Sequence, residues 1–145
     1  MARSKYWLPF LKDYLKVDEN TLIIGHSSGA TAAMRYAQNN KIWGSILVSP
    51  CYTDMELEEE KITGWYDEPW NWNLIKNNQN KIGLVYSKDD YIIPCREFDF
   101  VKNKLKPNEI LEFENKGHFL RQDTFPELLE LIKKMLDISN LKDKN

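Results

Sequence analysis

The sequence is poor in the residues on which several protein classes depend. Its 145 residues include only two cysteines and two histidines, and no apolar run reaches the roughly 18 residues that a membrane helix needs. The cysteines form no CxxC pair, and two cysteines with two histidines give no zinc-ligand spacing. No apolar stretch of signal-peptide length follows Met1. We therefore expect reduced thiols and a cytoplasmic protein that has no metal site and no membrane partner.

An excess of positive charge is also lacking. The formal net charge is −2, whereas nucleic-acid binders are usually basic and carry their charge in patches, so we expect no nucleic-acid partner. With 42% hydrophobic and 29% charged residues, the composition is typical of a globular protein. The length fits one domain over residues 1–145, and the polar residues 139–145 are predicted to be a frayed tail.

Apolar segments of two periodicities alternate along the chain. Short, β-branched runs predict four strands, and three- and four-residue spacings predict helices between them, with Ser4 and Thr124 as N-caps and Pro94 in a first turn. Pro9 lies inside the first helical pattern, so that helix either starts later or bends there. The predicted strands lie within 21–25, 42–49, 81–87 and 109–114, and the predicted helices cover 4–16, 28–39, a short stretch near 74–75, 94–105 and 124–136.

This alternation predicts the fold class. Strands that alternate with helices form a mainly parallel sheet with helices on both faces, which is a three-layer α/β/α architecture. Functional groups in such sheets gather at the carboxyl ends of the strands. The chemistry should therefore follow the strands directly.

The end of the first strand carries a G-x-S-x-G motif, read here as Gly25-His26-Ser27-Ser28-Gly29. Between a strand and a helix, this pattern is typical of a nucleophile elbow, a sharp turn that exposes the serine hydroxyl. The turn is expected to be so tight that side chains at Gly25 and Gly29 would collide with backbone. Ser27 is therefore the predicted nucleophile. His26 is its neighbour in the chain, and we expect its side chain to point elsewhere.

A serine nucleophile needs a base and an orienting acid. In proteins with a nucleophile elbow, the three residues occur along the chain in the order serine, acid, histidine. His118 is then the only candidate base, and it follows the fourth predicted strand. The acid should follow the third strand, where Asp89 and Asp90 are both present; Asp90 is preferred for its D-x-x-x-P spacing to Pro94, and Asp89 would then cap or solvate the loop. Asp54, after the second strand, is a weaker option.

The sequence resembles the small α/β-hydrolase-fold serine hydrolases of the retinoblastoma-binding protein 9 and YdeN-like family. The resemblance runs through Trp7-Leu8-Pro9-Phe10, TLIIGHSSGATAAMRY over 21–36, Gly64-Trp65-Tyr66, Pro69-Trp70-Asn71-Trp72, Ser87-Lys88-Asp89-Asp90 and Gly117-His118-Phe119. It implies Ser27, Asp90 and His118 as the triad, the backbone N–H of Ser28 as an oxyanion donor, and Trp70 and Trp72 beside the active-site mouth. It implies small acyl substrates and no cofactor. Core packing is the alternative role for the two tryptophans.

The sequence departs from the family in two places. Some animal members bind retinoblastoma protein through an LxCxE-type segment, but the matching residues here are LKVDE over 15–19, with Val17 in place of cysteine, so this partner is not expected. Family members also carry a strand, a Gly/Asn-rich loop with the second oxyanion donor, a helix and a strand before the segment that begins here. Without them, we expect weak or no activity and an exposed sheet edge that favours self-association.

Two functions of different classes follow. The first is a serine hydrolase that cleaves ester, amide or thioester substrates. The second is a non-catalytic relative of the α/β-hydrolases that binds a partner protein through the exposed edge or the Trp-rich face. A purely structural fragment without activity is a weaker third.

Overall fold

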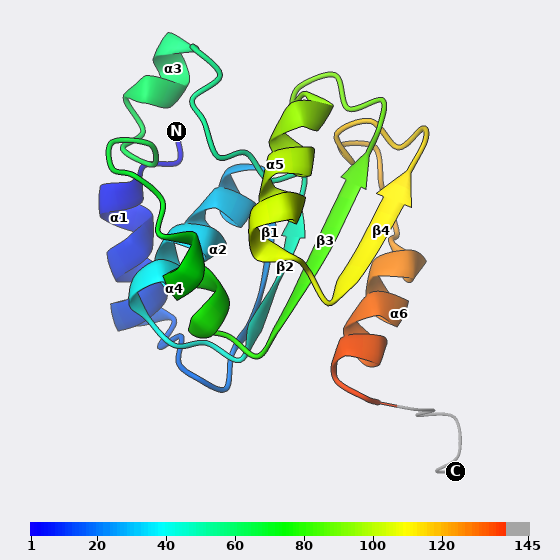
Figure 1. Ribbon diagram of the computed structural model, residues 1–145, viewed down its shortest axis with the longest axis horizontal. Helices are drawn as coiled ribbons and strands as arrows, with labels where there is room; N and C mark the ends of the chain where they lie inside the picture. Colours follow the sequence, from blue (N-terminus) through cyan, green and yellow to red (C-terminus); the bar gives the residue numbers. More distant parts are fainter. Residues whose placement is uncertain (139–145) are drawn as a thin grey trace.

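Four parallel strands form one sheet in the computed structural model, which describes residues 1–138 (Figure 1). Their order in the sheet follows the chain, from β1 (Leu22–His26) through β2 (Gly44–Val48) and β3 (Lys81–Ser87) to β4 (Glu109–Phe113). All three pairings are parallel, as the strand–helix alternation predicted. The predicted strands are therefore confirmed, with the first extending one residue further, to His26.

The helices lie on both faces, which confirms the predicted three-layer class, but they are divided unequally (Figure 1). The helices that connect successive strands lie on one face, because right-handed crossovers between strands in sequential order all return over the same side. Within residues 1–138, the other face is covered only by the helix after β4. The helices are α1 (Ser4–Pro9), η1 (Phe10–Tyr14), α2 (Ser28–Asn39), α3 (Glu58–Lys61), α4 (Trp72–Asn77), α5 (Cys95–Leu105) and α6 (Pro126–Met135).

Two hydrophobic cores hold the layers together. The larger core lies between the sheet and the α2–α5 layer, where α2 contributes Ala30, Ala33 and Ala37, all without exposed surface. These small side chains let α2 lie close to the strands, so that the turn before it can be tight. The smaller core joins β2 and β3 to Leu131 and Met135 of α6.

The ends of several helices differ from the sequence predictions. Arg3, not Ser4, is the N-cap of α1, and the Ser4 backbone N–H donates to the Thr63 carbonyl at 2.9 Å. Phe125, not Thr124, precedes α6, and Pro94 lies at the N-cap of α5 instead of its first turn. The first helix does not start after Pro9. It begins at Ser4 and changes to a π-helix directly after the proline.

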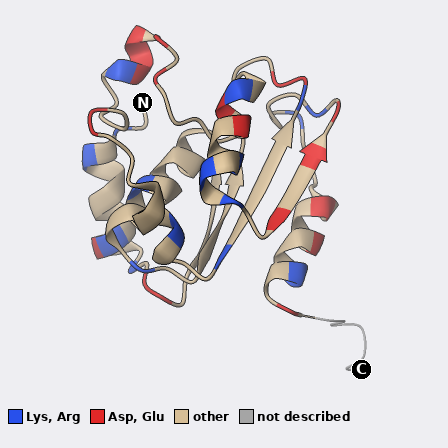
Figure 2. Ribbon diagram, in the orientation of Figure 1, with Lys and Arg blue, Asp and Glu red and all other residues tan. Residues whose placement is uncertain are grey.

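The two edge strands differ in charge. Edge strand β4 carries Glu109 and Glu112, which appear in red on the outermost arrow in Figure 2. Edge strand β1 contains no Asp, Glu, Lys or Arg, and Ile24 on it is 46% exposed. Within residues 1–138, β2 is the only strand that pairs with β1. The predicted exposed edge is therefore present in the described part of the chain.

Two further predictions concern membrane-spanning helices and the C-terminal tail. No helix within residues 1–138 has both the length and the apolar character needed to cross a membrane. The frayed tail predicted for 139–145 lies outside the described residues.

Candidate active site

Ser27 lies in a strained turn between β1 and α2. Its backbone has φ 55° and ψ −119°, a region that non-glycine residues rarely adopt. The turn is held on both sides, because the Ser27 N–H donates to the Val48 carbonyl at 2.9 Å and the Ser27 carbonyl accepts from the N–H of Ala30 at 2.9 Å. The surrounding sheet and helix thus maintain the strain. This is the geometry of a nucleophile elbow.

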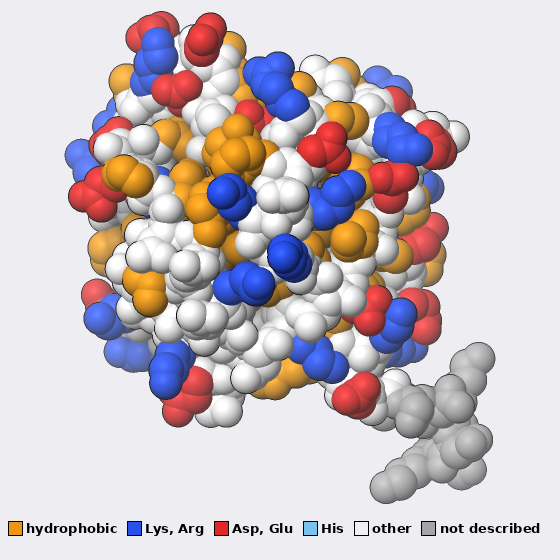
Figure 3. All heavy atoms as spheres, viewed as in Figure 1, with side chains coloured by type: hydrophobic (Ala, Val, Ile, Leu, Met, Phe, Trp, Pro, Cys, Tyr) orange, Lys and Arg blue, Asp and Glu red, His pale blue; other side chains and the backbone are white. Residues whose placement is uncertain are grey.

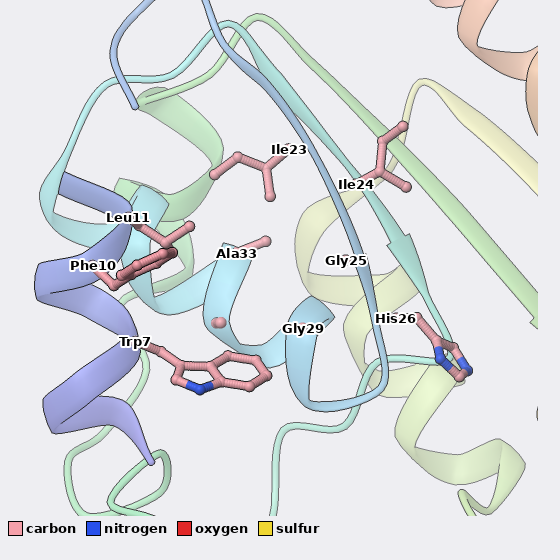
Figure 4. A pocket seen from close by; sticks show the side chains of 10 residues that line it. Trp7, Phe10, Leu11, Ile23, Ile24, Gly25, His26, Gly29 and Ala33 are labelled. Atoms are coloured by element: carbon pink, nitrogen blue, oxygen red, sulfur yellow. The ribbon is translucent and has the colours of Figure 1, made fainter. Parts of the chain in front are cut away.

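The two glycines of the motif play different parts. A Cβ atom added at Gly25 would lie 2.2 Å from the Gly29 carbonyl oxygen, so the predicted collision at Gly25 is confirmed. The collision predicted at Gly29 is wrong, because no atom of the described residues lies within 4 Å of a Cβ added there. The open space beside Gly29 is an apolar groove of about 340 Å³ between β1, α1 and α2, shown in Figure 4.

The N-terminus of α2 begins directly after Ser27. Ser28 is the first residue of that helix, so its backbone N–H has no acceptor within the helix. The partial positive charge of a helix N-terminus favours negative charge developing nearby. The Ser28 N–H can therefore donate to an oxyanion formed at Ser27.

His118 and Asp90 form a buried pair on the loops that follow β4 and β3. His118 Nδ1 lies 2.8 Å from Asp90 Oδ2, and the two side chains are only 4% and 0% exposed. Asp90 Oδ1 accepts two more hydrogen bonds, from the N–H groups of Ile92 and Ile93. With its Nδ1 directed to a carboxylate, the His118 ring has Nε2 available for a second proton partner.

The environment of Asp90 keeps its carboxylate charged. Burial alone would raise the pKa of Asp90, but the hydrogen bonds from His118 and from the N–H groups of Ile93 and Ile92 outweigh it, and the pKa lies below its ordinary 3.8. A charged carboxylate beside Nδ1 fixes the orientation of the His118 ring.

Asp89 has a different set of contacts. Its Oδ1 accepts from the Ser87 hydroxyl at 2.6 Å and from the Gly117 N–H at 2.8 Å, and these two bonds hold its pKa below 3.8. Asp89 therefore connects the β3 loop to the turn that carries His118. Asp54 accepts from the N–H of Glu56 within its own loop. Of the three candidate acids, the one hydrogen-bonded to His118 is Asp90.

His26, whose side chain was expected to point elsewhere than its neighbour Ser27, extends to the turn that carries His118. Its ring lies 4.7 Å from the His118 ring, and its Nε2 lies 2.8 Å from the His118 carbonyl oxygen. Strand β1 thus directs the side chain of His26 toward the turn that carries His118. Ser27 itself makes no hydrogen bond to His118 in the described structure.

Trp70 and Trp72 belong to an aromatic cluster between the loop after β2 and α5. Their rings stack at 5.4 Å, Trp72 packs edge-on against Tyr52 and Phe100, and Trp70 donates to the Tyr52 carbonyl. Hydrophobic side chains also reach the surface beside α5 in Figure 3. These contacts give both tryptophans a packing role. A place in the substrate pocket stays a prediction.

Arg35 organises the Trp-rich segment from beneath. This nearly buried guanidinium on α2 donates to the carbonyls of Trp65 and Glu68 at 2.7 and 2.6 Å and lies 3.5 Å over the Trp70 ring. Burial lowers the pKa of Arg35 below the ordinary value for an arginine. No group of three or more potential metal-ligating side chains occurs in the part of the chain that the structure describes.

Comparison with known proteins identifies the family. The serine hydrolase family model matches residues 1–137. The chain is also 42% identical to the serine hydrolase RBBP9 of Rattus norvegicus over 135 residues, which cover 93% of this chain and 72% of the rat protein. The chain belongs to the serine hydrolase family. It is thus an enzyme of the hydrolase class, as the motif and the resemblance predicted.

Solved structures agree with the fold of this serine hydrolase. The ydeN gene product of B. subtilis superposes with a TM-score of 0.80 at 22% identity, over 93% of this chain and 76% of that protein. A carboxylesterase of Nitrososphaera gargenis superposes with a TM-score of 0.70 at 14% identity, over 94% and 72% of the two chains. At these identities the similarity shows the α/β-hydrolase fold alone.

The contacts of three residues in and around this site were not predicted from the sequence. His26 was set aside although its place at a strand end could have indicated a contact at the sheet edge. Ser87 accepts from the Lys116 N–H and so helps to hold the turn before His118. Nothing in the sequence indicated that Arg35 is buried, because an arginine in a helix usually lies at the surface.

Proposed function

We propose that this serine hydrolase cleaves small ester, amide or thioester substrates with Ser27 as nucleophile, His118 as base and Asp90 as orienting acid. The single observation that carries the proposal is the buried His118–Asp90 pair, with its 2.8 Å contact at Nδ1. The strained backbone of Ser27 at the start of α2 supports the nucleophile assignment.

The first half of the reaction makes an acyl-enzyme. Ser27 Oγ attacks the substrate carbonyl while His118 Nε2 takes the hydroxyl proton, and Asp90 stabilises the imidazolium that results. The Ser28 N–H donates to the oxyanion of the tetrahedral intermediate. When this intermediate collapses, His118 returns the proton to the leaving alcohol, amine or thiol.

The second half repeats these steps with water. His118 takes a proton from water, the hydroxide attacks the acyl carbonyl, and the proton returns to Ser27 as the acid product leaves. No cofactor takes part in this scheme. We also infer a cytoplasmic location, which the two free thiols, Cys51 and Cys95, support.

Labelling with a fluorophosphonate probe tests the proposal. Mass spectrometry of the labelled protein should find the probe on Ser27, and Ser27→Ala or His118→Ala should lose both the label and the hydrolysis of a p-nitrophenyl ester. Asp90→Asn should lower kcat on the order of 10⁴-fold, because the imidazole loses its charged partner. Asp54→Asn, whose contacts lie in its own loop, is the matched control and should retain activity.

The same experiment decides against the alternative. Because weak activity is expected without the second oxyanion donor, the deciding protein is the chain extended at its N-terminus by the family's strand, loop, helix and strand. If that folded, extended chain neither labels nor hydrolyses, the proposal is overturned and the non-catalytic, protein-binding role is favoured. Labelling at a serine other than Ser27 would overturn the assignment of the nucleophile.

A further inference from the structure

The nucleophile and the proposed base are carried by strands that do not touch. Ser27 follows β1, whereas Asp90 and His118 follow β3 and β4, and β2 lies between the two groups in the sheet. Catalysis by these residues needs Ser27 Oγ and the His118 imidazole at hydrogen-bond distance. Something must therefore fix the turn of His118 relative to the end of β1.

Most hydrogen bonds that hold the turn of His118, residues 115–120, are made to the end of β3 and the loop after it. The N–H of Lys116 donates to the Ser87 hydroxyl, the N–H of Gly117 donates to Asp89, and His118 Nδ1 meets Asp90. All three of these anchors hold the turn to residues 87–90. None of them sets its distance from Ser27.

His26 supplies the link to the nucleophile strand. Its Nε2 lies 2.8 Å from the His118 carbonyl oxygen, and in the described part of the chain this is the hydrogen bond that joins β1 to residues 115–120. The two imidazole rings also touch, with centroids 4.7 Å apart. Because His26 directly precedes Ser27, a contact at its ring fixes the turn within one residue of the nucleophile.

We propose that His26 is a positioning residue, which ties the turn of His118 to the end of β1 and so sets the distance between Ser27 Oγ and the imidazole base. This inference rests on the proposed function. It assigns a role to His26, the one non-glycine residue of the GHSSG motif that the triad and the oxyanion donor leave unused.

The contact also fixes the tautomer of His26. A carbonyl oxygen only accepts hydrogen bonds, so His26 Nε2 must carry a proton, and the neutral ring then has no proton at Nδ1. Burial lowers the pKa of His26 below 6.5, and the neighbouring His118 lowers it further, against the opposing effects of the hydrogen bond and of Asp90. A neutral His26 adds no second positive charge beside the imidazolium that forms on His118 during the reaction.

Two substitutions separate positioning from mere packing. His26→Gln keeps an N–H donor near the Nε2 position, whereas His26→Leu keeps apolar bulk but has no donor. We expect His26→Leu to lower kcat about 10- to 100-fold with little change in KM, because small misplacements of a catalytic group have effects of that size. His26→Gln should recover most of the lost kcat. Ile24→Gln, two residues earlier on the same face of β1, is the control and should match the wild type.

A second measurement does not depend on activity. The chain has only two histidines, so ¹⁵N-histidine NMR spectra contain two ring systems, and His26→Gln assigns them. We expect His26 to be protonated at Nε2 and unprotonated at Nδ1 at neutral pH. The opposite tautomer would overturn the inference, whether or not the enzyme is active.

The outcomes distinguish this inference from the proposed function. Suppose that the wild type is active, that Ser27→Ala is inactive, and that a folded His26→Leu has the kcat of the wild type. In that case the positioning role is wrong and the proposed triad is retained. If His26→Leu and His26→Gln lose kcat equally, the donor is unimportant and the positioning role is again wrong. If a folded chain extended at its N-terminus by the family's strand, loop, helix and strand shows no labelling at Ser27, the proposed function itself fails.

Discussion

Gly25 and Gly29 flank the same serine, but only one of them is required by the space around it. A methyl group at Gly25 would overlap the Gly29 carbonyl oxygen, and backbone on both sides prevents an easy shift. At Gly29 the same methyl group would enter the groove beside β1. The motif therefore contains a steric requirement at its first glycine and open space at its last.

This difference predicts opposite effects of two similar substitutions. Gly25→Ala should lower the free energy of unfolding by about 1–3 kcal/mol, as overpacking typically does. Gly29→Ala lies in the first turn of α2 and should change stability by less than about 1 kcal/mol, in the stabilising direction, because alanine favours helix. Urea unfolding of both variants measures the difference. Equal destabilisation by the two would contradict the assignment of the tight contact to Gly25.

At the residue scale, the sequence predicted chemistry better than it predicted contacts. The tight turn at Ser27 was predictable because a strand and a helix surround a short motif whose first glycine has a steric cause. The contact of His26 with His118 was not, because it joins residues 92 positions apart whose proximity depends on how the sheet is assembled. Arg35 escaped for the same reason, since its carbonyl partners lie on a segment without regular structure.

At the scale of the elements, the loop between β3 and α5 concentrates the charge that the site uses. Asp90 is buried there, and its carboxylate is held by His118 and by two backbone N–H groups of the same loop. Its pKa in the folded protein is below the ordinary value. In the unfolded chain, Asp90 therefore takes up a proton at a higher pH than in the folded protein.

The sign of the pH dependence follows from this shift. The stabilisation by Asp90 is fully present above pH values near 3.8, and it is lost as the pH falls through the lower pKa of the folded state. Asp90→Asn should lower the free energy of unfolding at pH 7 and flatten its decline below pH 4. Urea unfolding of both proteins at pH 7 and in the acid range tests this. A variant whose stability declines in acid as steeply as the wild type would exclude Asp90 as the cause.

The strands and helices themselves were largely predictable, whereas their ends were not. Buried strands of a parallel sheet form continuous apolar runs, and these define the sheet without tertiary information. Ser4 and Thr124 have residue types that favour N-caps, yet α1 begins one residue earlier than a Ser4 cap would require, and α6 begins one residue later than a Thr124 cap would require. At Ser4 the backbone N–H bonds to Thr63 from another segment, a tertiary contact that outweighs local preference.

At the scale of the whole molecule, the two sheet edges are protected to different degrees. Edge strand β4 carries two glutamates, of which Glu109 pairs with Lys134 and Glu112 with Lys88. Such charges oppose pairing with a second sheet. Edge strand β1 has the sequence LIIGH, exposes Ile24 and adjoins the apolar groove. We therefore expect self-association, where it occurs, to take place through β1.

Two matched substitutions test which edge associates. Ile24 on β1 and Ile110 on β4 are exposed to nearly the same extent, 46% and 43%, so lysine costs little folding stability at either position. The wild type should show concentration-dependent association in sedimentation velocity runs, and Ile24→Lys should reduce it strongly because it places a charge on the unprotected edge. Ile110→Lys adds a charge to an edge that already has several and should leave association unchanged. A wild type that stays monomeric throughout, or equal effects of the two lysines, would show that the β1 edge does not drive association.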